Sequence, residues 1–296
     1  DLYAPLVASA QIRYSPEEAE AVVLDSLAPL GAEYTDVVRR SFRERWIDFL
    51  PTTGKRSGAY SEGAAYDVHP YVLLNYLGHY NDVSTLAHEL GHTMHSHYSN
   101  ATQPYPRASY PMFVAEVAST FNEALLIEHV LGQTTDRALR LSLLGSYLEN
   151  IKSTVFRQTQ FAEFELRMHE TFERGEPITG DRLNALFLGI TRKYYGHADG
   201  VCVVDDYVQH EWSYIPHFVH SPFYVYAYAF GDCLVNSLYA VYQDAHEGFA
   251  GRYLEMLKAG GTLRHKELLA PFGLDASKPE CWSKGLRVIE GFIDEL

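Results

Sequence analysis

Hydrophobic positions recur every three to four residues along most of this 296-residue chain, a pattern that predicts a mainly α-helical protein. The first helix is expected over residues 16–30, because Ser15, Pro16 and Glu18 form a strong helix-start signal. Further helices are expected over residues 35–46, 83–98, 111–130, 136–172, 181–195 and 222–242. Neither a repeat nor a clear linker interrupts this pattern, so we expect a single domain over residues 1–296.

The helical pattern is broken between residues 51 and 74. Pro51, Gly54 and two further glycines divide this segment into short extended pieces, and residues 71–74 predict a β-strand. We therefore expect a small β-hairpin or sheet. An edge strand at this position would pair with an extended peptide backbone, and an ordinary structural hairpin is the alternative.

Composition and charge restrict the range of partners. The chain has 24 Lys and Arg residues against 38 Asp and Glu, a formal net charge of -14 that disfavours nucleic acid and anionic membrane surfaces. No apolar stretch is long enough to span a bilayer, and no signal segment opens the chain. Cys202, Cys233 and Cys281 lack the spacing of a zinc knuckle or redox pair, so a reduced, cytoplasmic setting is expected.

Residues 88–92 read His-Glu-Leu-Gly-His inside one of the expected helices. Side chains four residues apart project from one helical face about one turn apart, so His88 and His92 can bind one metal ion together. Glu89 lies beside them, where its carboxylate can reach a water on that ion. Because the chain has 14 histidines, the motif also arises by chance and needs structural support, which Asp82 supplies as the expected N-cap of the helix.

Zinc bound by two histidines needs at least one further protein ligand, and a carboxylate from a second helix is a usual third. Glu116, 24 residues after His92, is the best candidate because it interrupts an apolar helical face; a surface glutamate is the alternative. Glu123 follows two turns later, where it would accept a hydrogen bond from a ligand histidine, with a simple salt bridge as the alternative. Gly91 leaves room for a close segment, and His95 is expected to support a ligand or to pack.

Two runs carry a family resemblance: HELGHTMHS at residues 88–96 and FVAEVASTFNE at residues 113–123. They resemble the oligoendopeptidase F branch of the thimet-oligopeptidase-like zinc metallopeptidases, as do residues 55–61, 215–218 and 222–228. The resemblance implies a zincin-like (gluzincin) helical catalytic domain with a small sheet near the active site. It also implies that one zinc ion is bound by the histidines of the motif and the later glutamate, and that the motif glutamate is the general base. Family members are about twice as long, and their N-terminal helical region is expected to be absent here.

A second group of candidate residues lies far along the chain. Ser221 and Pro222 predict a helix start, so Tyr224 and Tyr228 are expected to share a helical face, with His217 just upstream. The resemblance implies that a histidine and tyrosines of this region donate hydrogen bonds to the oxyanion of peptide hydrolysis. Core packing is the alternative for each of them, and which tyrosine donates is left open.

These expectations combine into a zinc-dependent metalloendopeptidase acting on short peptides, in which Glu89 takes a proton from a zinc-bound water and passes it to the leaving amine. A di-iron carboxylate enzyme is one alternative, because Glu89 and His92 also form a Glu-x-x-His motif. That class needs a second copy, which the sequence lacks. The other alternative is a non-catalytic zinc-binding relative of half length that needs a missing N-terminal region or partner.

Overall fold

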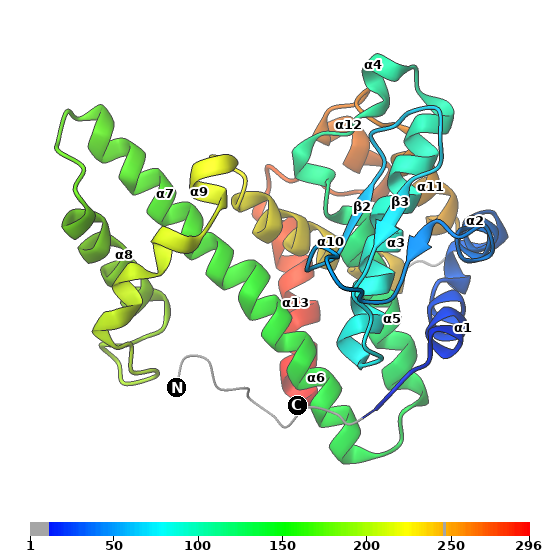
Figure 1. The fold of residues 1–296 in the computed structure, drawn as a ribbon, viewed down its shortest axis with the longest axis horizontal. Coiled ribbons are helices and arrows are strands. Elements are labelled where there is room, and N and C mark those ends of the chain that lie inside the picture. Colours follow the sequence, from blue (N-terminus) through cyan, green and yellow to red (C-terminus); the bar gives the residue numbers. More distant parts are fainter. Residues whose placement is uncertain (1–11, 245–246) are drawn as a thin grey trace. The chain divides into compact units, whose positions relative to one another are not determined.

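A computed structural model describes residues 12–244 and 247–296 of the chain (Figure 1). Most of the described elements are helices, and the three strands form one small sheet. The expected fold class, a mainly α-helical protein with a small sheet, is therefore confirmed. The described residues fall into two compact units, a larger one over residues 12–147 and 231–296 and a smaller one over residues 148–230. None of the helices in the described part of the chain is apolar over a length that would cross a bilayer.

The core of the larger unit is built around one long helix. This helix, α3 (Tyr80–Thr102), packs chiefly against α5 (Val117–Gln133) and α11 (Phe249–Lys258). Both α3 and α5 bury many of their side chains, which explains the long apolar runs in their sequences. The other helices of this unit are α1 (Pro16–Ser26), α2 (Ala32–Arg43), α4 (Tyr105–Ala108), α12 (His265–Leu269), α13 (Pro279–Glu295), most of α6 (Arg137–Ile151) and most of α10 (Tyr226–Asp244).

Helix α1 begins where the sequence predicts and ends four residues early. The Ser15 hydroxyl accepts a hydrogen bond from the Glu18 N–H, and the Glu18 carboxylate accepts one from the Ser15 N–H, as a capping box requires. The α-helix stops at Ser26, and a short 3-10 turn, Ala28–Leu30, follows. Pro29 explains the difference, because proline has no N–H to donate and disfavours helical backbone at the residue before it.

The sheet has the strand order β1-β3-β2. The central strand, β3 (Tyr71–Leu73), is parallel to β1 (Ile47–Asp48) and antiparallel to β2 (Tyr60–Glu62). Both β2 and β3 contact α3. The predicted strand is present, but the alternative that made it an edge strand is wrong, because strands pair with it on both sides; β2 is an edge of the sheet instead.

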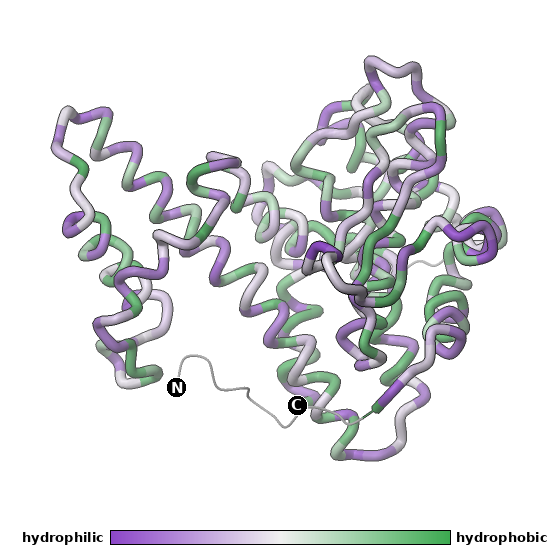
Figure 2. The backbone as a smooth tube through the Cα atoms, in the orientation of Figure 1, coloured by the Kyte–Doolittle hydropathy of each residue, from purple (hydrophilic) through white to green (hydrophobic). Residues whose placement is uncertain are grey.

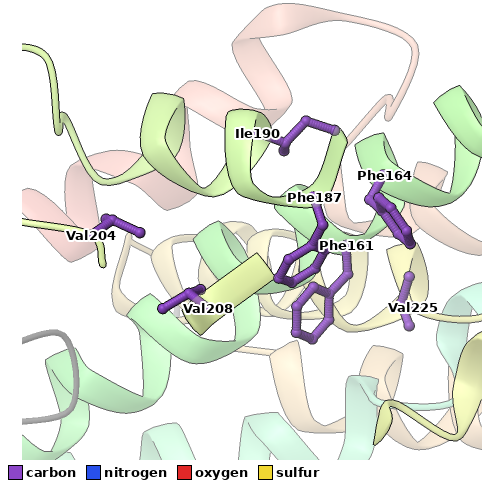
Figure 3. Packing of buried hydrophobic residues seen from close by; sticks show 7 residues of the cluster. All are labelled: Phe161, Phe164, Phe187, Ile190, Val204, Val208 and Val225. Atoms are coloured by element: carbon purple, nitrogen blue, oxygen red, sulfur yellow. The ribbon is translucent and has the colours of Figure 1, made fainter. Parts of the chain in front are cut away.

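The smaller unit has a hydrophobic core of its own. Its helices are α7 (Gln158–Glu173), α8 (Gly180–Tyr194) and α9 (His217–His220), together with a 3-10 segment, Asp206–Tyr214. Hydrophobic and hydrophilic residues alternate along α7 and α8 (Figure 2), and the buried side chains meet between these elements (Figure 3). The cluster consists of Phe161, Phe164, Phe187, Ile190, Val204, Val208 and Val225.

Two long helices differ in detail from the sequence prediction. The helix expected over residues 136–172 is formed by α6 and α7, joined by a π-helical segment, Lys152–Arg157. The helix expected to start at Pro222 starts at Tyr226 instead, and Ser221 is the C-cap of α9 rather than an N-cap. Phe223 explains the late start, since its positive φ of 59° is incompatible with right-handed helix.

Candidate metal centre

Helix α3 carries both histidines of the motif and begins at Tyr80, three residues earlier than expected. Its N-cap is His79. The Asp82 carboxylate accepts hydrogen bonds from the backbone N–H groups of Leu77 and His79, at 3.1 and 2.9 Å. The prediction of Asp82 as N-cap is therefore wrong. This residue lies in the first turn, where its negative charge also favours the positive end of the helix dipole.

His88, His92 and Glu116 bring together three atoms that could hold a metal ion. The two Nε2 atoms of the histidines lie 3.2 Å apart, and each lies 3.4 Å from the Glu116 Oε2 atom. The three atoms thus form a nearly equilateral triangle. The side chains that supply them are 27%, 19% and 12% exposed, so the cluster is partly accessible to solvent.

The triangle has dimensions that suit a zinc ion. Zinc binds imidazole nitrogen and carboxylate oxygen at about 2.0–2.1 Å with tetrahedral angles, which places neighbouring ligand atoms about 3.4 Å apart. The observed separations of 3.2 and 3.4 Å match that value. Two nitrogens and one oxygen also form a donor set that zinc accepts, and three protein ligands leave a fourth position open, as in catalytic rather than structural zinc sites.

The electrostatics of the cluster favour a cation. Burial alone would lower the pKa of His88, but the carboxylates of Glu123, Glu116 and Glu89 outweigh it and raise the pKa to about 9. Burial alone would raise the pKa of Glu116, but His92 and His88 outweigh it and lower the pKa to about 2. The same negative potential that attracts a proton to the imidazole attracts a divalent metal ion.

The Glu123 carboxylate contacts the first of these two histidines, His88. Its Oε1 atom lies 2.5 Å from the His88 Nδ1 atom, and its Oε2 atom accepts a hydrogen bond from the Ser84 hydroxyl at 3.1 Å. A proton on Nδ1 leaves Nε2 as the lone-pair nitrogen, which is the atom in the triangle. Ser84 was not among the residues predicted from the sequence, although it lies one turn before His88 on the same helical face.

We expect Glu123→Ala to weaken zinc binding by about 10- to 100-fold, because the ligand imidazole loses the acceptor that orients it. Glu123→Gln should weaken it less, since the amide oxygen still accepts the Nδ1 proton. Competition with a chromophoric chelator measures both affinities, and Ser84→Ala is the control that removes only the hydrogen bond behind Glu123. Equal zinc affinity of the wild type and Glu123→Ala would contradict this role.

Glu116 is the N-cap residue of α5. Its position depends on a hydrogen bond and on two close contacts at glycines. The helix expected to start at residue 111 begins at Val117, so Glu116 precedes the first turn, and the Ser119 hydroxyl donates a hydrogen bond to its Oε2 atom at 3.0 Å. A Cβ atom at Gly91 would lie 2.4 Å from the Ala118 carbonyl oxygen, so glycine allows α3 to touch this turn. A Cβ atom at Gly231 would lie 3.0 Å from the Glu116 Cβ atom, a contact that no local sequence signal indicates.

Glu89 has the surroundings that a proton-transfer group needs. Its side chain is on the buried side of α3, only 6% of the residue is exposed, and its Oε2 atom has no hydrogen-bond partner. Burial is the largest cause of a raised pKa for this carboxyl, although the charges of His88 and His92 oppose it. A buried carboxylate oxygen without a partner is costly for the fold, and a water molecule between it and the metal ligands would satisfy it.

His95 packs one turn past the motif. Its ring stacks on that of Tyr110 at a centroid distance of 3.6 Å, and its Nδ1 atom is buried without a partner. Burial, followed by the charge of His92, lowers the pKa of His95 to about 3. His95 is therefore a neutral, packed ring in the folded protein. Tyr110, which forms the other half of the stack, was not a candidate from the sequence.

The low pKa of His95 predicts acid sensitivity of the fold. The unfolded chain takes up a proton at this histidine near pH 6.5 and the folded chain only near pH 3, so stability falls as pH falls below about 6.5. Each pH unit in this window costs at most about 1.4 kcal/mol. We expect metal-free His95→Phe, which keeps a ring against Tyr110, to lose less stability in urea between pH 7 and pH 5 than metal-free wild type. An identical pH slope for the two proteins would contradict this expectation.

In the smaller unit, His217, Tyr224 and Tyr228 gather in one cluster. The His217 Nε2 atom lies 3.2 Å from the Tyr228 hydroxyl, and the two tyrosine rings lie 5.2 Å apart at their centroids. Tyr226, which was not expected to share the helical face of Tyr224 and Tyr228, is 45% exposed. Tyr224 precedes α10 instead of lying on it. The roles of these three residues as donors to an oxyanion stay a prediction.

A buried carboxylate holds the turn in front of Tyr224. Glu165 on α7 is 2% exposed, and its Oε1 atom accepts a hydrogen bond from the Phe223 N–H at 2.8 Å. Phe223 is one of two non-glycine residues with positive φ among the described residues. The hydrogen bond stabilises this strained backbone and thereby the position of the following tyrosine.

Comparison with known proteins gives one consistent family. The family model described as "Peptidase family M3" matches residues 13–288. Oligopeptidase PepF of Bacillus subtilis is 42% identical over the whole chain, which spans 43% of that protein. A protein of Chlamydophila abortus whose crystal structure is known has a TM-score of 0.84 at 39% identity, and here the chain spans 49% of the solved chain. The oligoendopeptidase-F structure from Enterococcus faecium has a TM-score of 0.65 at 29% identity, with 46% of that chain covered.

The chain thus spans about half the length of these relatives, while nearly all of its own residues are matched. The match includes the larger unit, with its triangle of ligand atoms, and the smaller unit, with its histidine and tyrosine cluster. The resemblance to the oligoendopeptidase F branch is confirmed, and the chain belongs to peptidase family M3.

Proposed function

We propose that the chain is the catalytic part of a zinc metalloendopeptidase that hydrolyses peptide bonds in short oligopeptides. One arrangement supports the proposal. Three possible ligand atoms lie at tetrahedral spacing, and the neighbouring residue Glu89 has a buried carboxylate oxygen without a hydrogen-bond partner. Peptide hydrolysis needs both features, a group that withdraws charge from the carbonyl and a base that takes a proton from water. Membership of a peptidase family supports the same conclusion.

The metal would be held by His88, His92 and Glu116. When bound there, zinc supplies Lewis-acid chemistry, polarising the peptide carbonyl and making water more acidic. Glu89 accepts the proton of the attacking water at Oε2 and later donates it to the nitrogen of the leaving amine. Burial raises the pKa of Glu89, and this favours uptake of the proton from water compared with an exposed carboxylate. Glu123 keeps the His88 ring oriented throughout.

The sheet offers a place for an extended peptide. Within the described part of the chain, β2 pairs with β3 alone, and its Ser61 hydroxyl lies 2.8 Å from the hydroxyl of Thr93, the residue after His92. An extended substrate backbone that adds to this edge would run alongside the metal-binding helix. The names of the relatives, oligopeptidase and oligoendopeptidase, favour short peptides as substrates.

Cleavage of a short quenched-fluorescent peptide tests this function. We expect hydrolysis that stops when a chelator removes the metal and resumes when zinc is added back, with one zinc ion per chain by metal analysis. A folded protein substrate should not be cut. Zinc binding without any chelator-sensitive hydrolysis would contradict the proposal and favour the alternative, a non-catalytic relative of half length that needs a further region or partner.

A further inference from the structure

A polar pocket of about 290 Å³ lies beside α3, just past the metal ligands. We call it the Ser96 pocket; its lining includes Ser61, Glu62, Tyr66, Ser96, Tyr105 and Tyr110. Ser96 follows His92 by one helical turn, so the two side chains project from neighbouring positions about 5–6 Å apart at Cβ. The pocket is smaller than a site for a drug-sized ligand and suits one large amino-acid side chain.

The edge strand β2 and α3 meet at this pocket through close contacts. A Cβ atom at Gly63 would lie 2.4 Å from the Ser96 Cβ atom, so only glycine lets the end of the strand approach the helix. The Asn100 side-chain amide donates a hydrogen bond to the Gly63 carbonyl oxygen at 2.9 Å. These contacts fix one wall of the pocket against the helix that carries the ligands. A peptide extended along β2 rises about 3.3 Å per residue, so the pocket lies within two residues of the bond being cut.

The pocket carries a negative charge from Glu62. Among the described residues that line the pocket, Glu62 alone is charged at neutral pH, and none is Lys or Arg. Its Oε1 atom accepts a hydrogen bond from the Ala64 N–H at 2.7 Å, which orients the carboxylate. In the described part of the chain, no cationic side chain forms an ion pair with Glu62. The carboxylate is thus held in place and available to a cation from outside.

Aromatic rings also line the pocket. The rings of Tyr66 and Tyr105 meet edge to face at 5.7 Å, and the Tyr66 hydroxyl donates a hydrogen bond to the Gln103 carbonyl oxygen at 2.6 Å. Tyrosine faces attract guanidinium and ammonium groups through their ring electrons. A carboxylate combined with ordered tyrosines is therefore chemistry that recognises a basic side chain rather than an acidic or aliphatic one.

Tyr110 connects the pocket to the metal centre. It stacks on His95, and its hydroxyl lies 3.3 Å from the Ser96 hydroxyl. Burial is the main reason for its raised pKa, and the charges of Glu116 and Glu62 raise it further. Tyr110 thus contacts Ser96 of the pocket and His95, which lies three residues after His92.

We propose that the Ser96 pocket binds an arginine or lysine side chain of the peptide substrate through Glu62, so that peptides with a basic residue within two positions of the cleaved bond are preferred. This inference rests on the proposed peptidase function and specifies its substrates. Arginine suits the site better than lysine, because a planar guanidinium can both pair with the carboxylate and stack on a tyrosine ring.

Two peptides that differ only in arginine against citrulline, its uncharged analogue of the same shape, test the proposal. We expect wild-type kcat/KM to be about threefold to fivefold higher for the arginine peptide, the upper range for one ion pair at an exposed carboxylate. Glu62→Gln should bring the ratio close to one. Asp67→Asn is the matched control, because it removes an exposed negative charge nearby that does not line the pocket and should leave the ratio unchanged.

Binding of the same peptides to Glu89→Gln, measured by fluorescence polarisation, separates this inference from the proposed function. A preference for arginine in binding that is lost in Glu89→Gln/Glu62→Gln supports the pocket assignment even where hydrolysis is absent, and only the peptidase proposal then fails. Equal binding and equal cleavage of the two peptides by proteins with an intact Glu62, or an unchanged ratio in Glu62→Gln, would overturn the assignment.

Discussion

Glu89→Gln is expected to reduce peptide hydrolysis by about 10³-fold while leaving zinc binding intact, since a positioned general base contributes about 10²–10⁴-fold. Glutamine has the size of glutamate but cannot take a proton from water at neutral pH. The residue is 6% exposed and its Oε2 atom lacks a hydrogen-bond partner, so the substitution breaks no hydrogen bond at that atom. The amide also avoids the cost of burying a charge, so the folded state should be at least as stable.

Initial rates with a quenched-fluorescent peptide and metal analysis of the same sample check this prediction together. Glu89→Asp is the matched control. It keeps a carboxylate on a side chain that is shorter by one methylene, so it should retain more activity than Glu89→Gln. A Glu89→Gln protein with full turnover would show that another group takes the proton. A Glu89→Gln protein without zinc would show instead that this residue helps to hold the metal.

Gly91→Ala is expected to impair both the fold and the metal site. The added Cβ atom would lie 2.4 Å from the Ala118 carbonyl oxygen and 2.5 Å from the Ser119 Cα atom, and backbone cannot give way as a flexible side chain can. Overpacking of this kind typically costs about 1–3 kcal/mol, and occasionally more. Because the displaced turn directly follows Glu116, the third ligand should shift, and zinc affinity should fall at least about tenfold.

Gly132→Ala is the matched control for this change. Gly132 also lies within a helix, α5, but a Cβ atom there would meet nothing within 4 Å. Alanine should therefore stabilise the protein by up to about 1 kcal/mol through helix propensity. Urea unfolding and zinc titration of both variants measure the difference. Wild-type stability and zinc affinity in Gly91→Ala would show that α3 and α5 do not need this close approach.

The sequence predicts the features of the metal centre that depend on residues close together in the chain. The spacing of His88 and His92 determines that they share a helical face, because helical geometry is set by the backbone and not by distant contacts. The apolar run around Glu116 and the seven-residue interval to Glu123 indicated a second helix with acids on one side. In the structure these side chains lie together, with the Glu123 carboxylate at the His88 Nδ1 atom and the Glu116 carboxylate at both Nε2 atoms.

The sequence predicts the ends of the helices less accurately. Asp82 and Ser221 both have the residue type of an N-cap, yet one lies inside the first turn of α3 and the other ends α9. Capping preference is worth about 1 kcal/mol, so tertiary contacts can override it. At Phe223 the hydrogen bond to a buried Glu165 holds a backbone conformation that no local pattern predicts.

The sequence by itself determined the helical class, the one-turn spacing of the ligand histidines and the presence of an acid beside them, since each depends on residues close together in the chain. Only the tertiary structure decided that Glu116 meets both imidazoles at 3.4 Å, that Gly91 and Gly231 make room for its segment, and that β2 is an edge strand beside the Ser96 pocket. These features depend on the packing of segments far apart in sequence, and packing is determined by the shapes of all the side chains together.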